Sequence, residues 1–442
     1  MKRVADLLQR EEHRQALVRL WVLGSDAQRL NAWERNRGPL ETMEAAATQF
    51  RADLDRPKSL NLNRIESAPL ALIRALDDHV AGSDSPYNRA SRGGRETLAR
   101  EEDGKDYWLL PIALQTRRLA SLNQQVGNLG AWFRRHVVLP STTAHGLHVT
   151  LSQSQSSVDD ALTRLWEQEP PALKVWIGHF NDTAQVQWTC NDLGNVRTTD
   201  IAPQKVRTDS LLAAMDSAAK HGAHIVVFPE FALDLEQRKA LVKHLRTNSY
   251  ASLILVVAGS FHEDEGDETF NTAPLYSASG QKLLTHRKLR VYGDLNHGAE
   301  DVSVGNSIHV LSTPVGCMTV LICKDFIDAH ASVDSLLTEV PVDWALVPSF
   351  GDEKTIKAHK ARAQTLAVVR TGTHSVVAQT LNTIIEREEP PTQCVRGFGH
   401  AAGSKTPDPQ VGETGGLVIF KLGQQEPPAS PPIRRMNLKR IK

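Results

Sequence analysis

The sequence predicts an α/β protein in two parts, and three observations carry this prediction. After residue 173, short apolar runs typical of buried strands alternate with helical patterns and turn residues. Residues 1–170 instead show apolar positions mainly at helical spacing. The chain of 442 residues is also long for one domain and sufficient for two. We therefore expect a mainly α-helical N-terminal domain at 1–170, an α/β domain at 173–422, and a Pro-rich, basic and disordered tail at 423–442.

Composition argues against several classes of function. Lysine plus arginine equals aspartate plus glutamate, 51 of each, so no overall field attracts nucleic acid or an anionic membrane. The apolar runs are far shorter than the ~20 residues of a membrane-spanning helix. The four cysteines (190, 317, 323 and 394) fit neither a disulfide framework nor metal-ligand spacing. With no secretory signal evident at the start, we expect a cytoplasmic protein that binds neither metal, membrane nor nucleic acid.

Helical periodicity is the main signal of the first part. One pattern follows Pro39, and the strongest has the alternating spacing of a helix packing seam, with Leu119, Leu122, Val126, Leu129 and Phe133. Residues 83–106 form a predicted polar loop, and 150–157 with 167–171 mark the predicted exit from this domain. Because no titratable cluster occurs before residue 173, we expect this domain to serve assembly, either in a larger homo-oligomer or with a partner protein.

Three predicted strands of the second part each end at a residue with useful chemistry. A buried strand ends at Glu230, and a hairpin over 270–289 has Lys288 at its end. A β-rich run at 318–322 delivers Cys323 to its carboxyl end. Nucleophiles of α/β folds occupy such strand ends, although each residue taken alone could be a cap, a solvated tip or a core thiol.

An acid, a cation and a thiol together suit attack on a carbonyl group. A thiol with the ordinary pKa of about 8.5 is mostly protonated at neutral pH and needs a base. The carboxylate of Glu230 can take that proton if burial raises its own pKa. The ammonium of Lys288 can then stabilise the oxyanion that grows when the Cys323 thiolate attacks.

The second part resembles the nitrilase, or carbon–nitrogen hydrolase, superfamily over about residues 173–422. Phe-Pro-Glu230 is similar to the family's glutamate motif, His-Arg-Lys288-Leu to its lysine motif, and Leu-Ile-Cys323-Lys-Asp to its nucleophile motif. Shorter motifs between and after these three also occur in the family's order. One such motif would be weak evidence, whereas the ordered set is specific.

The resemblance implies a four-layer α-β-β-α sandwich and a Glu-Lys-Cys triad. In that scheme Glu230 is the general base and later the acid, and Cys323 forms a thioester acyl-enzyme. Lys288 and the backbone amide of Lys324 would bind the oxyanion. The family commonly has an aromatic or small residue where this chain has Lys324, which leaves the substrate side of the pocket open.

The resemblance also implies residues that support the triad. Many members carry another glutamate between the lysine and cysteine motifs, and Glu300 is the best match, with Asp294 and Asp301 as competitors. Ser349 and Phe350 are placed at the substrate pocket by the same comparison.

We therefore predict a cysteine-dependent hydrolase of a non-peptide C–N bond, most simply the amide of a small molecule, with no cofactor. The alternative is a nitrilase-like regulatory, sensor or scaffold module that acts through a protein partner. The intact triad favours chemistry, whereas the helical extension favours an additional interaction. Superfamily members usually pair, so the resemblance also implies a homo-oligomer, a dimer or larger. Fold analogy does not choose the substrate.

Overall fold

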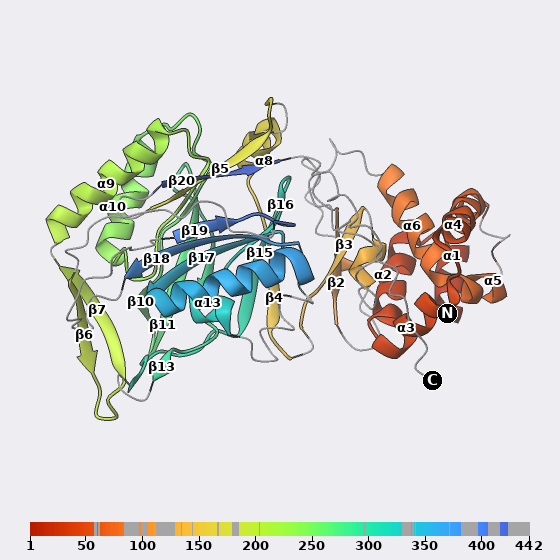
Figure 1. Cartoon of the computed structure of the whole chain (residues 1–442), viewed down its shortest axis with the longest axis horizontal. Helices are drawn as coiled ribbons and strands as arrows, with labels where there is room; N and C mark the ends of the chain where they lie inside the picture. Colours follow the sequence, from red (N-terminus) through yellow and green to blue (C-terminus); the bar gives the residue numbers. More distant parts are fainter. Residues whose placement is uncertain are drawn as a thin grey trace, which may run out of the picture.

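The computed structural model describes residues 1–56, 60, 62–83, 97–98, 105–111, 129–133, 135–143, 145–165, 168–178, 185–202, 204–294, 298–328, 337, 340, 342–370, 372–381, 397–404 and 416–422. The N-terminal helices lie at one end of the molecule and a β-rich body at the other, with a small sheet between them (Figure 1). The tail predicted at 423–442 lies outside the described residues.

Two sheets form the β-rich body. The first has the order β10-β11-β9-β8-β5-β20, with β12 paired to β11, and the second has the order β19-β18-β17-β16-β15-β4. The strands of the first sheet are β5 (Ala172–Ile177), β8 (Ile225–Val227), β9 (Leu255–Val257), β10 (Phe261–Glu265), β11 (Glu268–Ser277), β12 (Lys282–Arg287) and β20 (Gly416–Lys421). Those of the second are β4 (His148–Gln153), β15 (Ser307–Thr313), β16 (Gly316–Val320), β17 (Trp344–Gly351), β18 (His374–Leu381) and β19 (Gly397–His400).

Side-chain packing shows that these sheets form the middle of four layers. Alternate residues of β5 and β8, such as Val175 and Val227, share one core with Val320 and Leu346 of the second sheet. The outer face of the first sheet packs on α9 (Gln204–Lys220) and α10 (Leu235–Thr247). The outer face of the second sheet packs on α13 (Glu353–Gln364). The predicted α-β-β-α sandwich is confirmed.

Local sequence signals explain where two of these outer helices begin. Asp234 and Gln237 form a reciprocal capping box at the start of α10. Asp352 caps α13 by accepting a 3.0 Å hydrogen bond from the Thr355 amide. The helix α13 continues into a π-helical segment, η4 (Thr365–Arg370). A separate hairpin of β6 (Gln185–Cys190) and β7 (Val196–Ala202) was not among the predicted elements.

The N-terminal part is helical, as expected, and it also contains a three-stranded sheet that periodicity did not indicate. Its helices are α1 (Lys2–Gln9), α2 (His13–Gly24), α3 (Ala27–Asn36), α4 (Leu40–Leu54), α5 (Leu62–Ser67) and α6 (Pro69–Ser83). The sheet has the order β1 (Thr97–Leu98), β2 (Tyr107–Pro111) and β3 (His136–Pro140). Of the predicted helical seam, Leu119, Leu122 and Val126 lie outside the described residues. Leu129 opens a 3₁₀ turn, η2 (Leu129–Trp132), and Phe133 follows it.

The prediction that residues 150–157 form an exit loop is wrong. Residues up to Gln153 belong to β4, which pairs in parallel with β15 and so forms an edge of the second sheet. The next helix, α8 (Ser156–Arg164), buries Val158 and Leu162 in the core between the sheets. The Ser- and Gln-rich composition misled because only one face of this edge strand is covered.

The strand β3 gives a matched pair of substitutions that separates the two parts. Its neighbouring residues Val137 and Val138 are both buried, but Val138 joins the helical core whereas Val137 joins the core around α13. Replacing either with Ala should cost about 1–3 kcal/mol of stability, because each change leaves a cavity. We expect Val137→Ala to lower the unfolding midpoint of the sandwich and Val138→Ala that of the helical domain. Calorimetry checks this, and identical shifts of one shared transition would contradict it.

Candidate active site

The three residues predicted from strand ends converge in the structure. Glu230 follows β8 and Lys288 follows β12 in the first sheet, and Cys323 follows β16 in the second. Each is at most 5% exposed. Glu230 and Cys323 meet at Ser349, whose carbonyl oxygen accepts a 3.3 Å hydrogen bond from the Glu230 amide and whose hydroxyl lies 3.4 Å from Cys323 Sγ.

Cys323 occupies a strained corner between β16 and the short helix α11 (Lys324–Ile327). Its φ of 43° and ψ of −99° are rare for a residue with a side chain, and such backbone costs about 1–3 kcal/mol. The surroundings hold it there, because its amide donates a 2.8 Å hydrogen bond to the Pro348 carbonyl oxygen. A sharp corner of this kind presents the thiol at a tip instead of in the pleat of a strand.

The ammonium of Lys288 lies between two buried carboxylates. Its Nζ donates to Glu230 Oε1 at 2.9 Å and to Glu300 Oε2 at 2.7 Å. The side-chain amide of Asn271 bridges the same two carboxylates, donating at 2.9 Å to Glu230 and at 3.1 Å to Glu300. Two carboxylates therefore share the one ammonium group of Lys288 in a buried site.

The two carboxylates differ in their hydrogen-bond donors, and this separates their pKa values. Burial alone would raise the pKa of Glu300, but Lys288, His262 and a 2.8 Å bond from the Tyr292 amide hold it well below its usual range. Burial and the charge of Glu300 raise the pKa of Glu230, and Lys288 only partly offsets them. The pKa of Glu300 is thus lowered and that of Glu230 raised, so Glu230 binds a proton more readily than Glu300 does.

The thiol itself is protonated at rest. Burial and the negative charge of Glu230 raise the pKa of Cys323 to about 12, although Lys288 acts in the opposite direction. The Ser349 hydroxyl lies 3.4 Å from Sγ, and the Phe350 carbonyl oxygen lies 3.6 Å from it. For Lys288, burial would lower the pKa, yet the neighbouring carboxylates hold it above its usual value, so this side chain stays charged.

His262 completes the shell around Glu300 as a neutral donor. Its Nδ1 accepts a 2.9 Å hydrogen bond from the Thr198 amide, so the ring proton is on Nε2. That nitrogen lies 3.4 Å from Glu300 Oε1. Burial lowers the pKa of His262, which keeps the ring uncharged beside the Lys288 ammonium.

Three aromatic side chains form a wall next to the site. Phe231 follows Glu230 directly, with a φ of 54°, and its ring packs edge-on at 5.3 Å against both Trp188 and Phe350. Trp188 comes from the β6–β7 hairpin, which approaches the site because Val196 bridges to Glu300. A substrate that reaches Cys323 from this side meets an apolar surface.

The other predicted residues divide between the site and its support. Ser349 is fully buried and donates to or accepts from His359 at 2.9 Å, so it positions the thiol more than it lines open space. The side chain of Lys324 turns to the Val291 carbonyl oxygen, 3.1 Å away. Asp301 does not contact Lys288, and the side chain of Asp294 lies outside the described residues. Within the described ranges, no group of His, Cys, Asp and Glu is arranged to hold a metal.

Asp325 ties the lysine loop to the cysteine corner. One oxygen accepts from the amides of Leu289 and Arg290 at 3.0 and 2.8 Å. The other accepts from His286 at 2.9 Å and from the Ile322 amide at 3.2 Å. The loop beyond Lys288 and the backbone before Cys323 are thus fixed by a single buried carboxylate.

Sequence reasoning missed several of these side chains. Asn271 lies within the Phe-Asn-Thr-Ala hairpin motif and Asp325 within the nucleophile motif, but the motifs alone did not indicate a role for either side chain. His262 and Trp188 stand in segments with no motif, and only the pairing of β10 and of the β6–β7 hairpin brings them to the site.

Comparisons with known proteins agree with this geometry. A family model described as carbon-nitrogen hydrolase matches residues 184–333, a stretch that contains Glu230, Lys288 and Cys323. The omega-amidase NIT2 of Danio rerio is 28% identical over 143 residues, which are 27% of this chain and 51% of that protein. The chain therefore spans about half the length of this curated relative. The match of residues 184–333 to this family model, together with the omega-amidase, confirms the resemblance to the nitrilase superfamily.

Solved structures of the superfamily are also similar to this chain. Nit3 of Saccharomyces cerevisiae, a member of branch 10 of the nitrilase superfamily, is 16% identical with a TM-score of 0.40, covering 57% of this chain and 90% of that one. An amidase from Nesterenkonia sp. is 20% identical with a TM-score of 0.39, at the same two coverages. In the parts of the chain that the structure describes, no helix has the length and apolar character needed to cross a membrane.

The raised pKa of Glu230 predicts how stability depends on pH. Because the folded state keeps this proton to a higher pH than the unfolded chain, Glu230 stabilises the fold below its unfolded pKa of about 4.3. That contribution is lost as pH rises through the higher folded pKa. Replacing Glu230 with Gln removes the loss, so the variant should gain thermal stability relative to wild type as pH rises from 4 to 8.

Unfolding midpoints measured across that range test this, with Glu236→Gln, an exposed change on α10, as the control. A difference between wild type and Glu230→Gln that stays constant with pH, or moves in the opposite direction, would show that the carboxyl keeps its ordinary pKa.

The contacts of Asp325 predict a defect in positioning. Asp325→Asn turns an NH₂ group toward backbone amides that need an acceptor, so both loops should shift. We expect kcat to fall at least tenfold, with a loss of about 1–3 kcal/mol in stability. Asp328→Asn, at the C-cap of the same helix but partly exposed and paired with Arg290 at 2.9 Å, is the control and should lower kcat less than threefold. Equal kcat values for the two variants would contradict this role.

Proposed function

We propose that the sandwich hydrolyses a non-peptide C–N bond, most simply that of an amide, through a thioester on Cys323. One observation carries the proposal. A buried thiol at a strained corner is coupled to a carboxylate of raised pKa and to an ammonium that stays charged. The match of residues 184–333 to the carbon–nitrogen hydrolase family model supports the same class of reaction.

The first half of the reaction follows from the pKa values. Because burial and the charge of Glu230 raise the pKa of the Cys323 thiol to about 12, the thiol is protonated at neutral pH, so the proton must leave as sulfur attacks. Ionised Glu230 takes this proton while Sγ bonds to the carbonyl carbon. The oxyanion is stabilised by Lys288 Nζ and by the Lys324 amide, which starts α11 and has no acceptor within that helix.

The second half returns the proton and releases the products. Glu230, now protonated, donates to the leaving nitrogen, the C–N bond breaks, and the thioester remains on Cys323. Water then attacks the thioester, and Glu230 takes a proton from it as the carbonyl carbon separates from sulfur. The thiol regains its proton and the acid product leaves. Glu300 keeps Lys288 charged and in place throughout and exchanges no proton.

Amide turnover by point variants tests the proposal. Glu230→Gln should lower the rate by about 10²–10⁴-fold and Lys288→Ala at least as much, while Cys323→Ala should abolish turnover. Cys190→Ala, at an exposed thiol on the β6–β7 hairpin, is the matched control and should keep wild-type rates. Ammonia release from a panel of amides, ureides and nitriles gives both the rates and the substrate class.

Mass spectrometry during turnover should also detect the acylated peptide that contains Cys323. If Cys323→Ala retained turnover, or if acylation mapped to another cysteine, the assignment of the nucleophile would be wrong. The alternative, a sensor or scaffold, would show ligand binding with no product from any member of the panel.

A further inference from the structure

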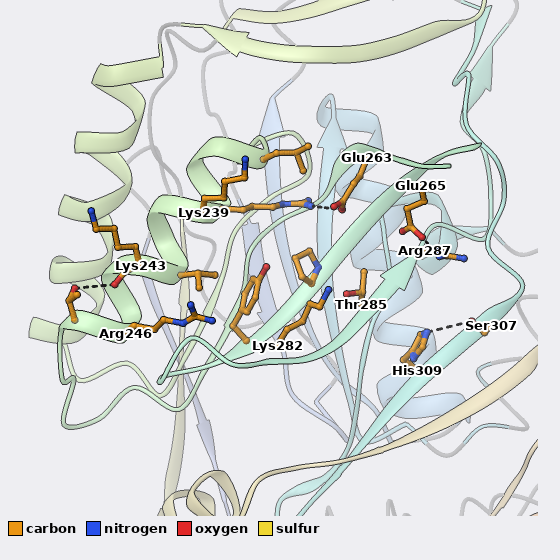
Figure 2. Close-up of a pocket in the computed structure, with 16 residues that line it drawn as sticks. Lys239, Lys243, Arg246, Glu263, Glu265, Lys282, Thr285, Arg287, Ser307 and His309 are labelled. Atoms are coloured by element: carbon orange, nitrogen blue, oxygen red, sulfur yellow. Dashed lines mark hydrogen bonds and ion pairs between the residues drawn. The ribbon is translucent and has the colours of Figure 1, made fainter. Parts of the chain in front are cut away.

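A large groove lies on the outer face of the first sheet (Figure 2). It has a volume of about 1120 Å³. The helix α10 forms one wall, and the strands β10, β11 and β12, with the start of β15 beside them, form the floor. Glu230, Lys288 and Cys323 do not line it, so the chemistry proposed above leaves this groove without a role.

One end of the groove is cationic. Lys243 and Arg246 extend from α10, and Lys282 extends from the start of β12 across from them (Figure 2). All three side chains are exposed, and none forms an ion pair within the described part of the chain. The turn before β12 packs closely against α10, because a Cβ placed on Gly280 would lie 3.1 Å from Arg246 Cγ.

The other cations of the groove already have acidic neighbours. Lys239 pairs with Glu236 at 2.7 Å, outside the lining. Arg238 lies 3.7 Å from Glu263, and Arg287 pairs with Glu265. The unmatched positive charge is therefore concentrated at the end formed by Lys243, Arg246 and Lys282.

The opposite end is acidic. The tip of the β10–β11 hairpin, with the strand ends on both sides of its turn, carries an acid at every position from 263 to 268 except Gly266: Glu263, Asp264, Glu265, Asp267 and Glu268. Three arginines, at 197, 238 and 287, pair with the first three of these, and Asp267 and Glu268 form no ion pair within the described residues. The turn projects into open space, since nothing lies within 4 Å of a Cβ placed on Gly266. We call residues 263–268 the acidic tip.

We propose that this groove binds the acidic tip of a second copy of the same chain. A two-fold axis across the groove would bring each tip to the partner's Lys243, Arg246 and Lys282, and the two contacts would be identical. The acidic tip of each copy then lies against the cationic end of the other, in a chain whose overall charge is zero.

The lining argues against two other anionic ligands. A nucleic acid would place phosphates against Glu263 and Glu265 and would find Tyr276 as the one aromatic side chain to stack on among those that line the groove. A small phosphorylated molecule held by Lys243, Arg246 and Lys282 would stay largely in solvent, because all three side chains are exposed, whereas small-ligand sites enclose most of the ligand.

The chemistry also predicts the strength of the contact. Exposed ion pairs contribute little each and are screened by salt, and the apolar part of the floor is small. The association should therefore be reversible and strong only at low ionic strength.

Light scattering of the full chain tests the contact. At 50 mM salt the mass should be twice that at 500 mM salt. The variant Lys243→Glu/Arg246→Glu/Lys282→Glu should show the lower mass at both salts. The variant Lys205→Glu/Lys220→Glu/Lys354→Glu changes the charge equally at exposed sites outside the groove and should behave as wild type. Unchanged unfolding midpoints verify that each variant folds.

A charge exchange identifies the occupant. The variant Asp267→Lys/Glu268→Lys should also remain at the lower mass, because like charges then meet. Mixing it with the cationic-end variant should restore the doubled mass, since both contacts of the mixed pair regain opposite charges. Failure of this rescue, or equal weakening by the control variant, would overturn the proposal. Single-stranded oligonucleotide that binds the groove of a protein whose mass is independent of salt would also overturn it and indicate a nucleic-acid surface.

Discussion

The site depends on one ammonium group shared by two buried carboxylates. Removing three charges from water is costly, and a net negative charge remains after Lys288 pairs with Glu230 and Glu300. Most of the hydrogen-bond donors around this pair of carboxylates point to Glu300: they are Lys288, His262, Asn271 and the Tyr292 amide. Glu230 accepts fewer hydrogen bonds, so burial and the nearby charge of Glu300 raise its pKa. A carboxylate that binds a proton readily inside the fold is what acid–base chemistry on an amide needs.

This distribution of hydrogen-bond donors explains why the site lowers the stability of the fold at pH values where Glu230 is ionised. Ionised Glu230 and the left-handed corner at Cys323 both cost free energy, and each is imposed by the contacts around it. Asp325 supplies much of that constraint by accepting four hydrogen bonds from two loops. Because the loops come from different sheets, the packing of the two sheets and the spacing between ammonium and thiol are set together.

The strand-end residues could be predicted from the sequence because their signals are local. Glu230, Lys288 and Cys323 each follow a short apolar run, and the family motifs fix their order. The carboxylate that joins Glu230 at Lys288 could be predicted less firmly: Glu300 is the best match, but it reaches Lys288 through a loop in which Asp294 and Asp301 compete with it. The strand β4 was missed for a different reason. Its residues are polar on the face that solvent meets, and its partner β15 lies about 160 residues away, so no periodicity within the segment reports the pairing.

The small sheet of the N-terminal part joins the helical domain to the sandwich. Every residue of β3 is buried, which requires cover on both faces. One face, with Val138, packs on the helices, and the other, with Val137 and Leu139, enters the core that also contains Leu289. Leu289 follows Lys288 and donates its amide to Asp325. The helical domain is thus packed through this sheet onto the core that contains Leu289, the residue that follows Lys288.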